Sequence, residues 1–94
     1  MIDISAFKKL KGTRLKIADT SYIDGKEAKR IRVETFHMSQ SAFAEALDVS
    51  KKTVEKWESG DNKPNATARR LLFLLSENPV LMAKLYRIVD EKKE

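Results

Sequence analysis

The residues of this 94-residue chain that are best suited to chemistry form a polar cluster between positions 50 and 56. They are Ser50, Lys51, Lys52, Glu55 and Lys56. Lysine ammonium groups donate hydrogen bonds to acceptors such as guanine O6 and N7 or to phosphates, and a carboxylate accepts from the amino group of cytosine. This is the chemistry of reading a polyanion through hydrogen bonds, in which no bond is made or broken. Glu55 has a simpler interpretation, in which it pairs with Lys51 or Lys52 on a helix surface.

Further polar residues flank this cluster on both sides. They are Ser39 and Gln40 before it, and Asn62, Lys63 and Asn65 after it. The first two begin an expected helix, where free backbone N–H groups and the positive end of the helix dipole attract a phosphate. The other three can extend such a backbone contact beyond the cluster. Ser39 and Ser50 are also explained as helix caps alone, and Arg69 and Arg70 fit a phosphate contact and a solvent-exposed position equally well.

Apolar residues between positions 39 and 60 have the spacing of two short helices that cross at a steep angle. They are Phe43, Ala44, Leu47, Val49, Val54 and Trp57. Ala44 stands where the helices approach most closely, so a longer side chain there would push them apart. The polar cluster occupies the remaining, outward positions. The pattern predicts a helix-turn-helix, whose second helix enters the major groove of DNA with its N-terminal residues at the base edges.

Capping residues mark where the helices begin. Asp24, with a glutamate three residues later that reaches back to it, predicts a first helix that ends near His37. Ser39 and Ser50 are each preceded by an apolar residue and followed by another four positions later, an arrangement that fixes the angle at which the chain enters the helix. Gly60 supplies a left-handed stop after the second helix of the motif.

Two more helices are expected in the C-terminal third of the chain. Asn65 caps one helix, whose centre is the run of five apolar residues at 71–75, too many for a small core to cover. Asn78 and Pro79 begin a last helix, which extends to about Glu91 and has a wide apolar face. Some of this apolar surface is expected to meet a second molecule. Together with the three earlier helices, these make an all-α, five-helix domain.

The bulk composition is typical of one small domain. The chain is 41% hydrophobic and 35% charged, and its net charge of +5 with a pI near 9.6 favours a polyanionic partner. It has no cysteine, no signal-peptide core and no apolar run of the ~20 residues that span a bilayer. We therefore expect a cytoplasmic protein without a membrane segment.

Residues 1–23 are interpreted as an N-terminal extension to a helix-turn-helix domain of residues 24–94. Ile4, Phe7 and Leu10 have helical spacing, whereas residues 14–17 alternate as a short strand would, and both possibilities stay open. Five basic residues in this extension have no acidic residue among them, so they form either an arm that touches phosphates or a solvated face. These are Lys8, Lys9, Lys11, Arg14 and Lys16.

The sequence contains none of the arrangements that catalysis needs. There is no glycine-rich phosphate loop and no nucleophile with a nearby histidine, so an enzyme is not expected. His37 is the only histidine, and without cysteines or an acidic cluster around it a metal site lacks ligands. We expect it to be a turn residue, and no cofactor is implied.

The segment MSQSAFAEALDVSKKTVEKWESGDNKPNATARRLL resembles the lambda-repressor-like, or XRE-type, helix-turn-helix domain, and most closely its HigA-type antitoxin branch. The recurring elements cover residues 38–75. They are SQ at 39–40, FA at 43–44, VS at 49–50, TV at 53–54, WE at 57–58, Gly60, Pro64 and RLL at 70–72. The resemblance implies a homodimer that binds a palindromic operator, often in its own promoter, and in the antitoxin branch neutralisation of an mRNA-cutting toxin.

The resemblance also implies roles for single residues. The DNA contacts of the family correspond here to Gln40, Ser50, Lys51, Lys52, Thr53 and Lys56. The glutamate after the tryptophan, Glu58, often pairs with an arginine of the first helix. Arg32 is the candidate, although it stands eight residues before Gln40 instead of seven and Val33 occupies the usual place. Asp48 stands where the family commonly has glycine, so we expect a left-handed backbone there at a cost of about 1 kcal/mol.

The predicted function is therefore that of a dimeric repressor of a palindromic operator, with residues 50–56 in the major groove. One alternative is a mainly protein-binding antitoxin, in which residues 1–23 or the last helix hold a toxin. Another is a free-standing or phage regulator with no toxin partner. An RNA-binding role is disfavoured, because the chain lacks the aromatic stacking platform that such modules use.

Overall fold

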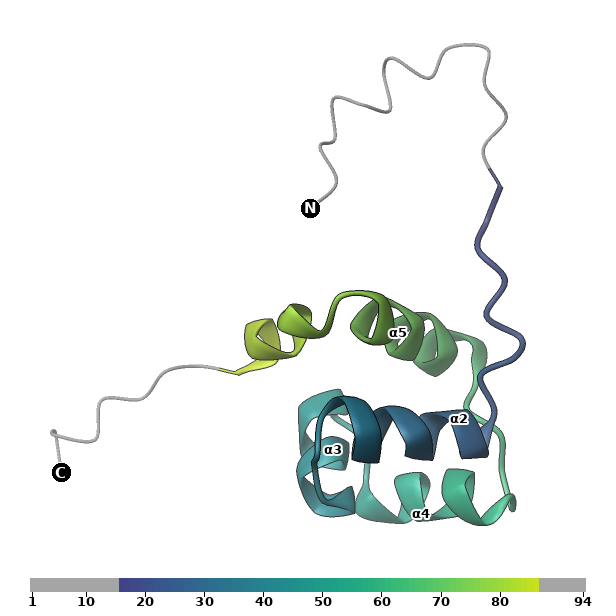
Figure 1. The fold of residues 1–94 in the computed structure, drawn as a ribbon. Coiled ribbons are helices and arrows are strands. Elements are labelled where there is room, and N and C mark those ends of the chain that lie inside the picture. The colour runs from purple at the N-terminus through teal and green to yellow at the C-terminus, as the bar shows by residue number, and fades with distance from the viewer. Residues whose placement is uncertain (1–15, 87–94) are drawn as a thin grey trace, which may run out of the picture.

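The computed structural model describes residues 16–86, and all regular structure within this range is helical (Figure 1). Helix α2 (Gly25–Arg30) continues directly into the π-helix η1 (Ile31–Thr35), and the two form the first helix of the domain. The others are α3 (Gln40–Leu47), α4 (Lys51–Ser59), α5 (Ala66–Glu77) and the 3₁₀ helix η2 (Pro79–Leu85). The prediction of an all-α, five-helix domain is confirmed. The helix expected at 4–10 lies outside the described residues, as do most of the basic arm and the first half of the alternative strand at 14–17. Lys16 and Ile17 are described and have no regular structure.

The helices begin where capping residues predict them. Ser39 Oγ accepts a hydrogen bond from the backbone N–H of Ala42 at 3.1 Å, and Ser50 Oγ accepts from that of Thr53 at 3.0 Å. Asn65 Oδ1 likewise accepts from the backbone of α5 at 2.8 Å. Because each cap satisfies an N–H group that the helix itself leaves without a partner, these boundaries depend on local sequence alone.

The cap of the first helix differs from the prediction in one contact. Asp24 Oδ1 accepts from the backbone N–H of Glu27 at 2.9 Å, as expected. The carboxylate of Glu27, however, does not reach back to Asp24. It binds the Arg30 guanidinium instead, with Nε to Oε1 at 3.0 Å and Nη2 to Oε2 at 2.6 Å. A charged, two-pronged partner one turn away is stronger than a single bond to a backbone N–H group.

The core lies between the first helix, α3, α4, α5 and η2. Its buried residues are Ile23, Ala28, Ile31, Phe43, Ala44, Leu47, Val54, Trp57, Leu72, Leu75 and Met82. The set includes the apolar residues predicted from the spacing between 39 and 60, except that Val49 is only partly buried. Thr20 and Ile23, which precede the first helix, are buried as well. No helix within residues 16–86 is long and apolar enough to cross a bilayer.

The C-terminal part of the domain exposes apolar surface, and its last helix differs from the prediction. In the run 71–75, Leu72 and Leu75 are buried whereas Leu74 is 53% exposed. The last helix is a 3₁₀ helix, Pro79–Leu85, and the backbone of Tyr86 is extended, so the expected α-helix is wrong in type and is interrupted at Tyr86. The rest of the expected helix, to about Glu91, lies outside the described residues. Only Met82 of η2 is buried. Short helices depend on tertiary packing, and one buried residue gives little of it.

Helix α4 lies at one edge of the domain, with the first helix between it and α5 (Figure 1). It packs against both α2 and α3. The closest approach is at Gly25, the first residue of α2. A Cβ atom built on Gly25 would overlap the carbonyl oxygen of Trp57 and lie 2.6 Å from its carbonyl carbon. The position of α4 against α2 therefore requires glycine at this point.

Candidate nucleic-acid interface

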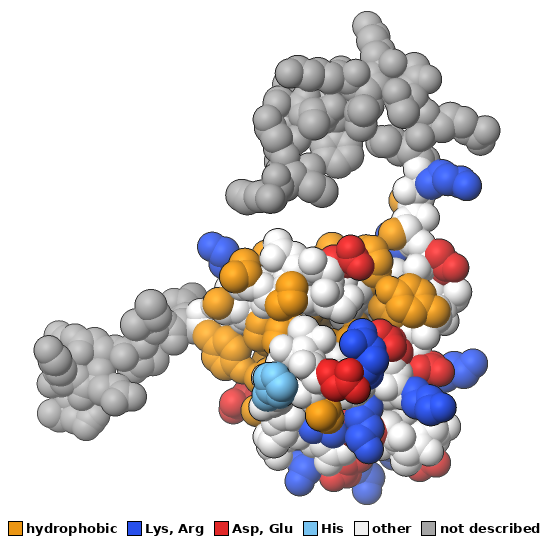
Figure 2. Space-filling view, in the orientation of Figure 1, with side chains coloured by type: hydrophobic (Ala, Val, Ile, Leu, Met, Phe, Trp, Pro, Cys, Tyr) orange, Lys and Arg blue, Asp and Glu red, His pale blue; other side chains and the backbone are white. Residues whose placement is uncertain are grey.

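Helix α4 buries one face and presents its polar residues on the other. Val54 and Trp57 are buried, whereas Lys51, Lys52 and Lys56 are exposed. Charged side chains gather at the end of the molecule where α4 lies, and apolar ones are more frequent above them (Figure 2). The three lysines are thus held on one outward face by the packing of the opposite one. Periodicity alone predicts this arrangement.

The charged residues of α4 are only weakly paired. Lys51 Nζ lies 4.0 Å from Glu55 Oε2, and both side chains are largely exposed, so the pair contributes at most about 1 kcal/mol. Among the described residues, neither Lys52 nor Lys56 has an ion-pair partner. Both line an open hollow of about 230 Å³ together with Glu55, Ser59 and Asp61. Glu55 can therefore pair with Lys51, as its simpler interpretation predicts. Because this pair is weak, Glu55 can exchange Lys51 for another partner at little cost in free energy.

A second hollow, of about 420 Å³, brings four of the predicted residues together. Thr53, Asn62, Lys63 and Asn65 line it, over apolar walls that include Trp57 and Leu71. The backbone N–H of Asn62 donates to the Lys56 carbonyl at 3.2 Å, which carries the chain past the end of α4. The hydroxyl of Thr53 lies 2.9 Å from that of Ser50, so it belongs to the cap of α4.

The two arginines of α5 are held by backbone carbonyls. Arg69 Nη1 donates to the Pro64 carbonyl at 2.9 Å, and Arg70 Nη1 donates to the Ala18 carbonyl at 2.7 Å. Each arginine therefore ties a loop to α5, a role that neither of the two sequence interpretations included. The segment at 16–19 has no regular structure of its own, and nothing in the local sequence signals its contact with Arg70.

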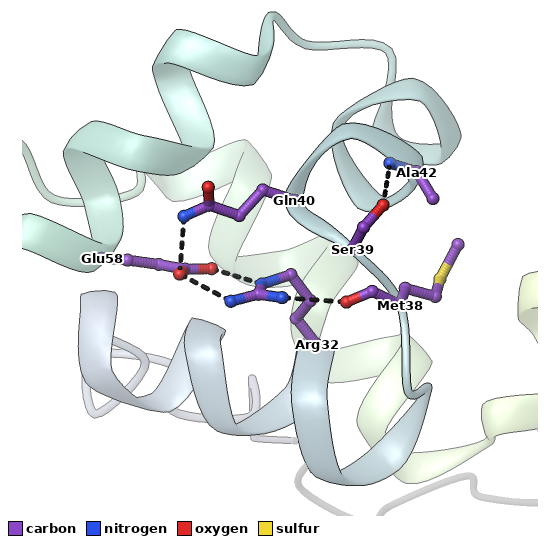
Figure 3. A network of polar contacts seen from close by, with 6 residues as sticks. All are labelled: Arg32, Met38, Ser39, Gln40, Ala42 and Glu58. Atoms are coloured by element: carbon purple, nitrogen blue, oxygen red, sulfur yellow. Dashed lines mark hydrogen bonds and ion pairs between the residues drawn. The ribbon is translucent and has the colours of Figure 1, made fainter.

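Gln40 lies in a polar network that joins the first helix, α3 and α4 (Figure 3). Arg32 Nε donates to Glu58 Oε2 at 2.6 Å, and its Nη2 donates to Oε1 at 2.9 Å. Arg32 Nη1 donates to the Met38 carbonyl at 2.8 Å. Gln40 Nε2 donates to Glu58 Oε1 at 3.0 Å. The pairing of Arg32 with Glu58 that the family resemblance implies is present, in spite of the eight-residue spacing.

A wide turn accommodates the extra residue. The N–H of Phe36 donates to the Ile31 carbonyl five residues back, and the N–H of Met38 donates to the Arg32 carbonyl six residues back. The second bond spans one residue more than in the usual left-handed helix ending. His37, which the sequence predicts as a turn residue, has a positive φ of 52° in this turn. The π-helical turn thus absorbs one residue and leaves Arg32 facing Glu58.

The network is mostly buried, and its charges determine its energetics. The side chains of Arg32 and Glu58 are 12% and 7% exposed. Burial raises the pKa of Glu58, but hydrogen bonds from Arg32 and Gln40 and the charges of Arg32 and Lys29 outweigh it, so the pKa lies below its usual 4.5. The hydrogen bond to Glu58 likewise raises the pKa of Arg32. Removal of either partner would leave the other charge buried alone, at a cost of about 3–5 kcal/mol.

The turn between α3 and α4 has the expected left-handed residue. Asp48 has φ 59° and ψ 45° and ends α3. The backbone N–H of Val49 then donates to the Ala44 carbonyl at 3.0 Å, and Ser50 caps α4 directly afterwards. The prediction for Asp48 is confirmed. A turn of this shape sets the angle between the two helices of the motif.

Gly25 is the position that sequence reasoning missed. Its contact with α4 joins residues that are more than thirty positions apart, so no local pattern could reveal it. A weak signal was nevertheless present. Glycine just inside a helix is unfavourable relative to alanine, and its occurrence there suggests a packing requirement.

Comparison with known proteins agrees with this geometry. Residues 29–74 match the family model described as helix-turn-helix. The matched region, which is just under half of the chain and includes α3 and α4, is thus similar to helix-turn-helix domains. The chain is also similar to antitoxin HigA-2 of Vibrio cholerae serotype O1 (strain ATCC 39315 / El Tor Inaba N16961), with 38% identity over 52 residues. The alignment covers 55% of this chain and 50% of that antitoxin, so the chain spans about half the length of this relative.

Proposed function

We propose that the chain is a dimeric repressor that binds a palindromic operator through α4. The observation that carries the proposal is the outward face of α4, where three exposed lysines stand on a capped and packed helix within the region that matches the helix-turn-helix family. Lys51 and Lys52 donate to guanine O6 and N7, and Glu55 accepts from cytosine N4. Lys56 reaches either a base or a phosphate.

Residues beside α4 bind the phosphate backbone and set the register on the duplex. Ser39 and Gln40 bind a phosphate at the start of α3. Asn62 and Lys63 act beyond the end of α4, and Ser50 and Thr53 at its start. The position of Asn62, Lys63 and Thr53 around one hollow supports their action as a group.

The salt dependence of binding tests the proposal. Fluorescence anisotropy with a duplex selected from random sequences would give a log–log slope near −5 for contacts to about six phosphates per dimer. Lys52→Ala should weaken binding to that duplex by about 1–3 kcal/mol, and less on random DNA. Lys84→Ala, which removes an exposed lysine of η2, is the matched control and should change little. A flat salt response would contradict DNA binding, and an equal loss on both duplexes would make Lys52 a phosphate contact.

Exposed apolar side chains support a dimer in which the C-terminal part of the domain meets a second copy. Leu74, Val80, Leu85 and Tyr86 are all largely exposed, Val80 by 71%. Two copies that bind one face of DNA would place their α4 helices about 34–36 Å apart. Light scattering after gel filtration should report a dimer, and Leu74→Glu should yield a monomer. Ile17→Glu, at a still more exposed apolar residue before the first helix, should leave the dimer intact.

A second candidate function is toxin neutralisation, which the similarity to antitoxin HigA-2 favours. In this case residues 1–23 or the C-terminal helix would hold the toxin. Co-expression with the product of the neighbouring gene provides the test. Growth arrest by that product alone, relieved by this chain, would support the antitoxin. A neighbour that is harmless would leave a free-standing or phage regulator.

A further inference from the structure

We propose that Arg32 is a positioning residue for DNA binding, which orients the Gln40 amide through Glu58. The inference rests on the proposed contact between Gln40 and a DNA phosphate. Arg32 and Glu58 are mostly buried, so neither needs to touch DNA itself. Their effect on binding would pass through a single hydrogen bond, from Gln40 Nε2 to Glu58 Oε1 at 3.0 Å.

Glu58 decides which way the amide of Gln40 faces. An ionised carboxylate only accepts hydrogen bonds, so the amide must turn its NH₂ group toward it. The amide oxygen then points away from Glu58, as Figure 3 shows. One N–H group of Nε2 is used by Glu58 and the second stays available. That second N–H group can donate to a phosphate oxygen at the start of α3.

Arg32 in turn decides where the carboxylate of Glu58 lies. Its Nε and Nη2 bind the two carboxylate oxygens at 2.6 and 2.9 Å, so the carboxylate cannot rotate. Its Nη1 holds the carbonyl of Met38, two residues before Gln40, at 2.8 Å. One guanidinium therefore fixes both the acceptor that Gln40 uses and the chain segment from which Gln40 projects. Two parallel bonds of this kind give geometric specificity that a lysine cannot reproduce.

The wide turn after η1 serves this arrangement. A regular helix advances each residue by about 100° around its axis, so one extra residue would turn Arg32 away from Glu58. The bonds that reach back five and six residues take up this extra residue in the π-helical turn at the end of the first helix. Val33, at the usual family position, is left exposed. This turn keeps Arg32 in contact with Glu58, the hydrogen-bond acceptor of Gln40.

The first test observes the Gln40 amide directly, without DNA. Gln40 is the only glutamine in the chain, and its side-chain NH₂ signals in a ¹⁵N spectrum can be told from those of the asparagines by their loss in Gln40→Ala. In the wild type, one of the two protons should be shifted downfield by the carboxylate. Arg32→Lys should move both signals toward those of a free glutamine. Arg30→Lys is the matched control, because Arg30 forms a similar two-pronged pair with Glu27 that does not touch Gln40. Unchanged Gln40 signals in folded Arg32→Lys would overturn the proposal.

The second test is a double-mutant cycle on operator binding, measured on variants whose backbone spectra show a folded domain. Ordering a free glutamine costs up to about tenfold in affinity, so Arg32→Lys should weaken binding by up to that factor. In a Gln40→Ala background, the same substitution should have no further effect. Equal losses in both backgrounds would show that Arg32 does not act through Gln40. If Arg32→Lys does not fold, Glu58→Gln replaces it in both tests, and the signals of the introduced glutamine are identified in the Gln40→Ala background. The wild type could show the shifted Gln40 proton and yet fail to bind an operator. That result would contradict the proposed function but not the orientation of Gln40 by Arg32 and Glu58.

Discussion

Replacement of Gly25 by alanine should be among the most destabilising single-methyl changes in this domain. The added Cβ would overlap the Trp57 carbonyl oxygen and lie 2.6 Å from the carbonyl carbon, where ordinary contacts begin at 3.4 Å. The oxygen cannot turn away, because it accepts the N–H group of Gly60 at 3.2 Å at the end of α4. Relief therefore requires that α2 and α4 separate by about 1 Å or more, along a contact that fixes the position of α4.

The magnitude follows from the nature of this clash. Overpacking of a core usually costs about 1–3 kcal/mol, and a clash with backbone instead of a flexible side chain belongs at the upper end or above. Alanine returns less than about 1 kcal/mol in helix propensity. We expect a net loss of about 3 kcal/mol, out of a total of roughly 5–14 kcal/mol for a chain of this size. The melting temperature should fall by about 12–24 °C.

Urea denaturation followed by the fluorescence of Trp57, the only tryptophan, measures this loss. Gly60→Ala is the matched control. A Cβ there would meet nothing within 4 Å, but φ is +88°, so only backbone strain of about 1–2 kcal/mol is expected. Comparison of the two variants thus distinguishes the cost of a steric clash, at Gly25, from the cost of backbone strain, at Gly60. If Gly25→Ala proves as mild as Gly60→Ala, the close approach of α2 to α4 is wrong.

Three other changes test separate parts of the structure through the free energy of unfolding. Because the folded pKa of Glu58 is lowered, its stabilisation is complete above its usual pKa of 4.5 and is lost as the pH falls through the folded value. Acid should therefore destabilise the wild type more steeply than Glu58→Gln, and parallel pH profiles would contradict this. Ser50→Ala should cost about 1 kcal/mol through loss of the cap, whereas exposed Ser41→Ala should cost under about 0.5 kcal/mol. Asp48→Gly should stabilise by up to about 1 kcal/mol, and a loss would show that φ 59° carries no strain.

The features that the sequence predicts correctly are the local ones. Ser39, Ser50 and Asn65 cap the helices because a cap joins residues only three positions apart. The buried face of α4 follows from helical periodicity in the same way. Asp48 is predictable because the conformation of a turn residue depends mainly on its own side chain.

The features that the sequence leaves undetermined depend on contacts between distant segments. The eight-residue spacing between Arg32 and Gln40 shows that one residue is extra, but not whether a helix turn or a loop absorbs it. The early end of η2 follows from how little of it the core can bury. Glu27 had two partners within reach, and the choice of Arg30 depended on the relative strength of two bonds. In each case the outcome depends on a comparison of free energies in three dimensions.

The contacts of α4 are distributed unequally along its length, and this bears on how it would bind DNA. Its C-terminal half is anchored by buried Trp57, by the ion pair of Glu58 with Arg32 and by the close approach of Gly25. Its first turn is held by the Ser50 cap and by buried Val54, and Lys51 and Lys52 extend into solvent. A helix held on one face and exposed on the other can enter a groove without any rearrangement of its backbone, which lowers the entropic cost of binding. A buried ion pair is weak evidence for stability in itself. Its position at the anchored end of α4, in contact with Gln40, favours a role in orientation.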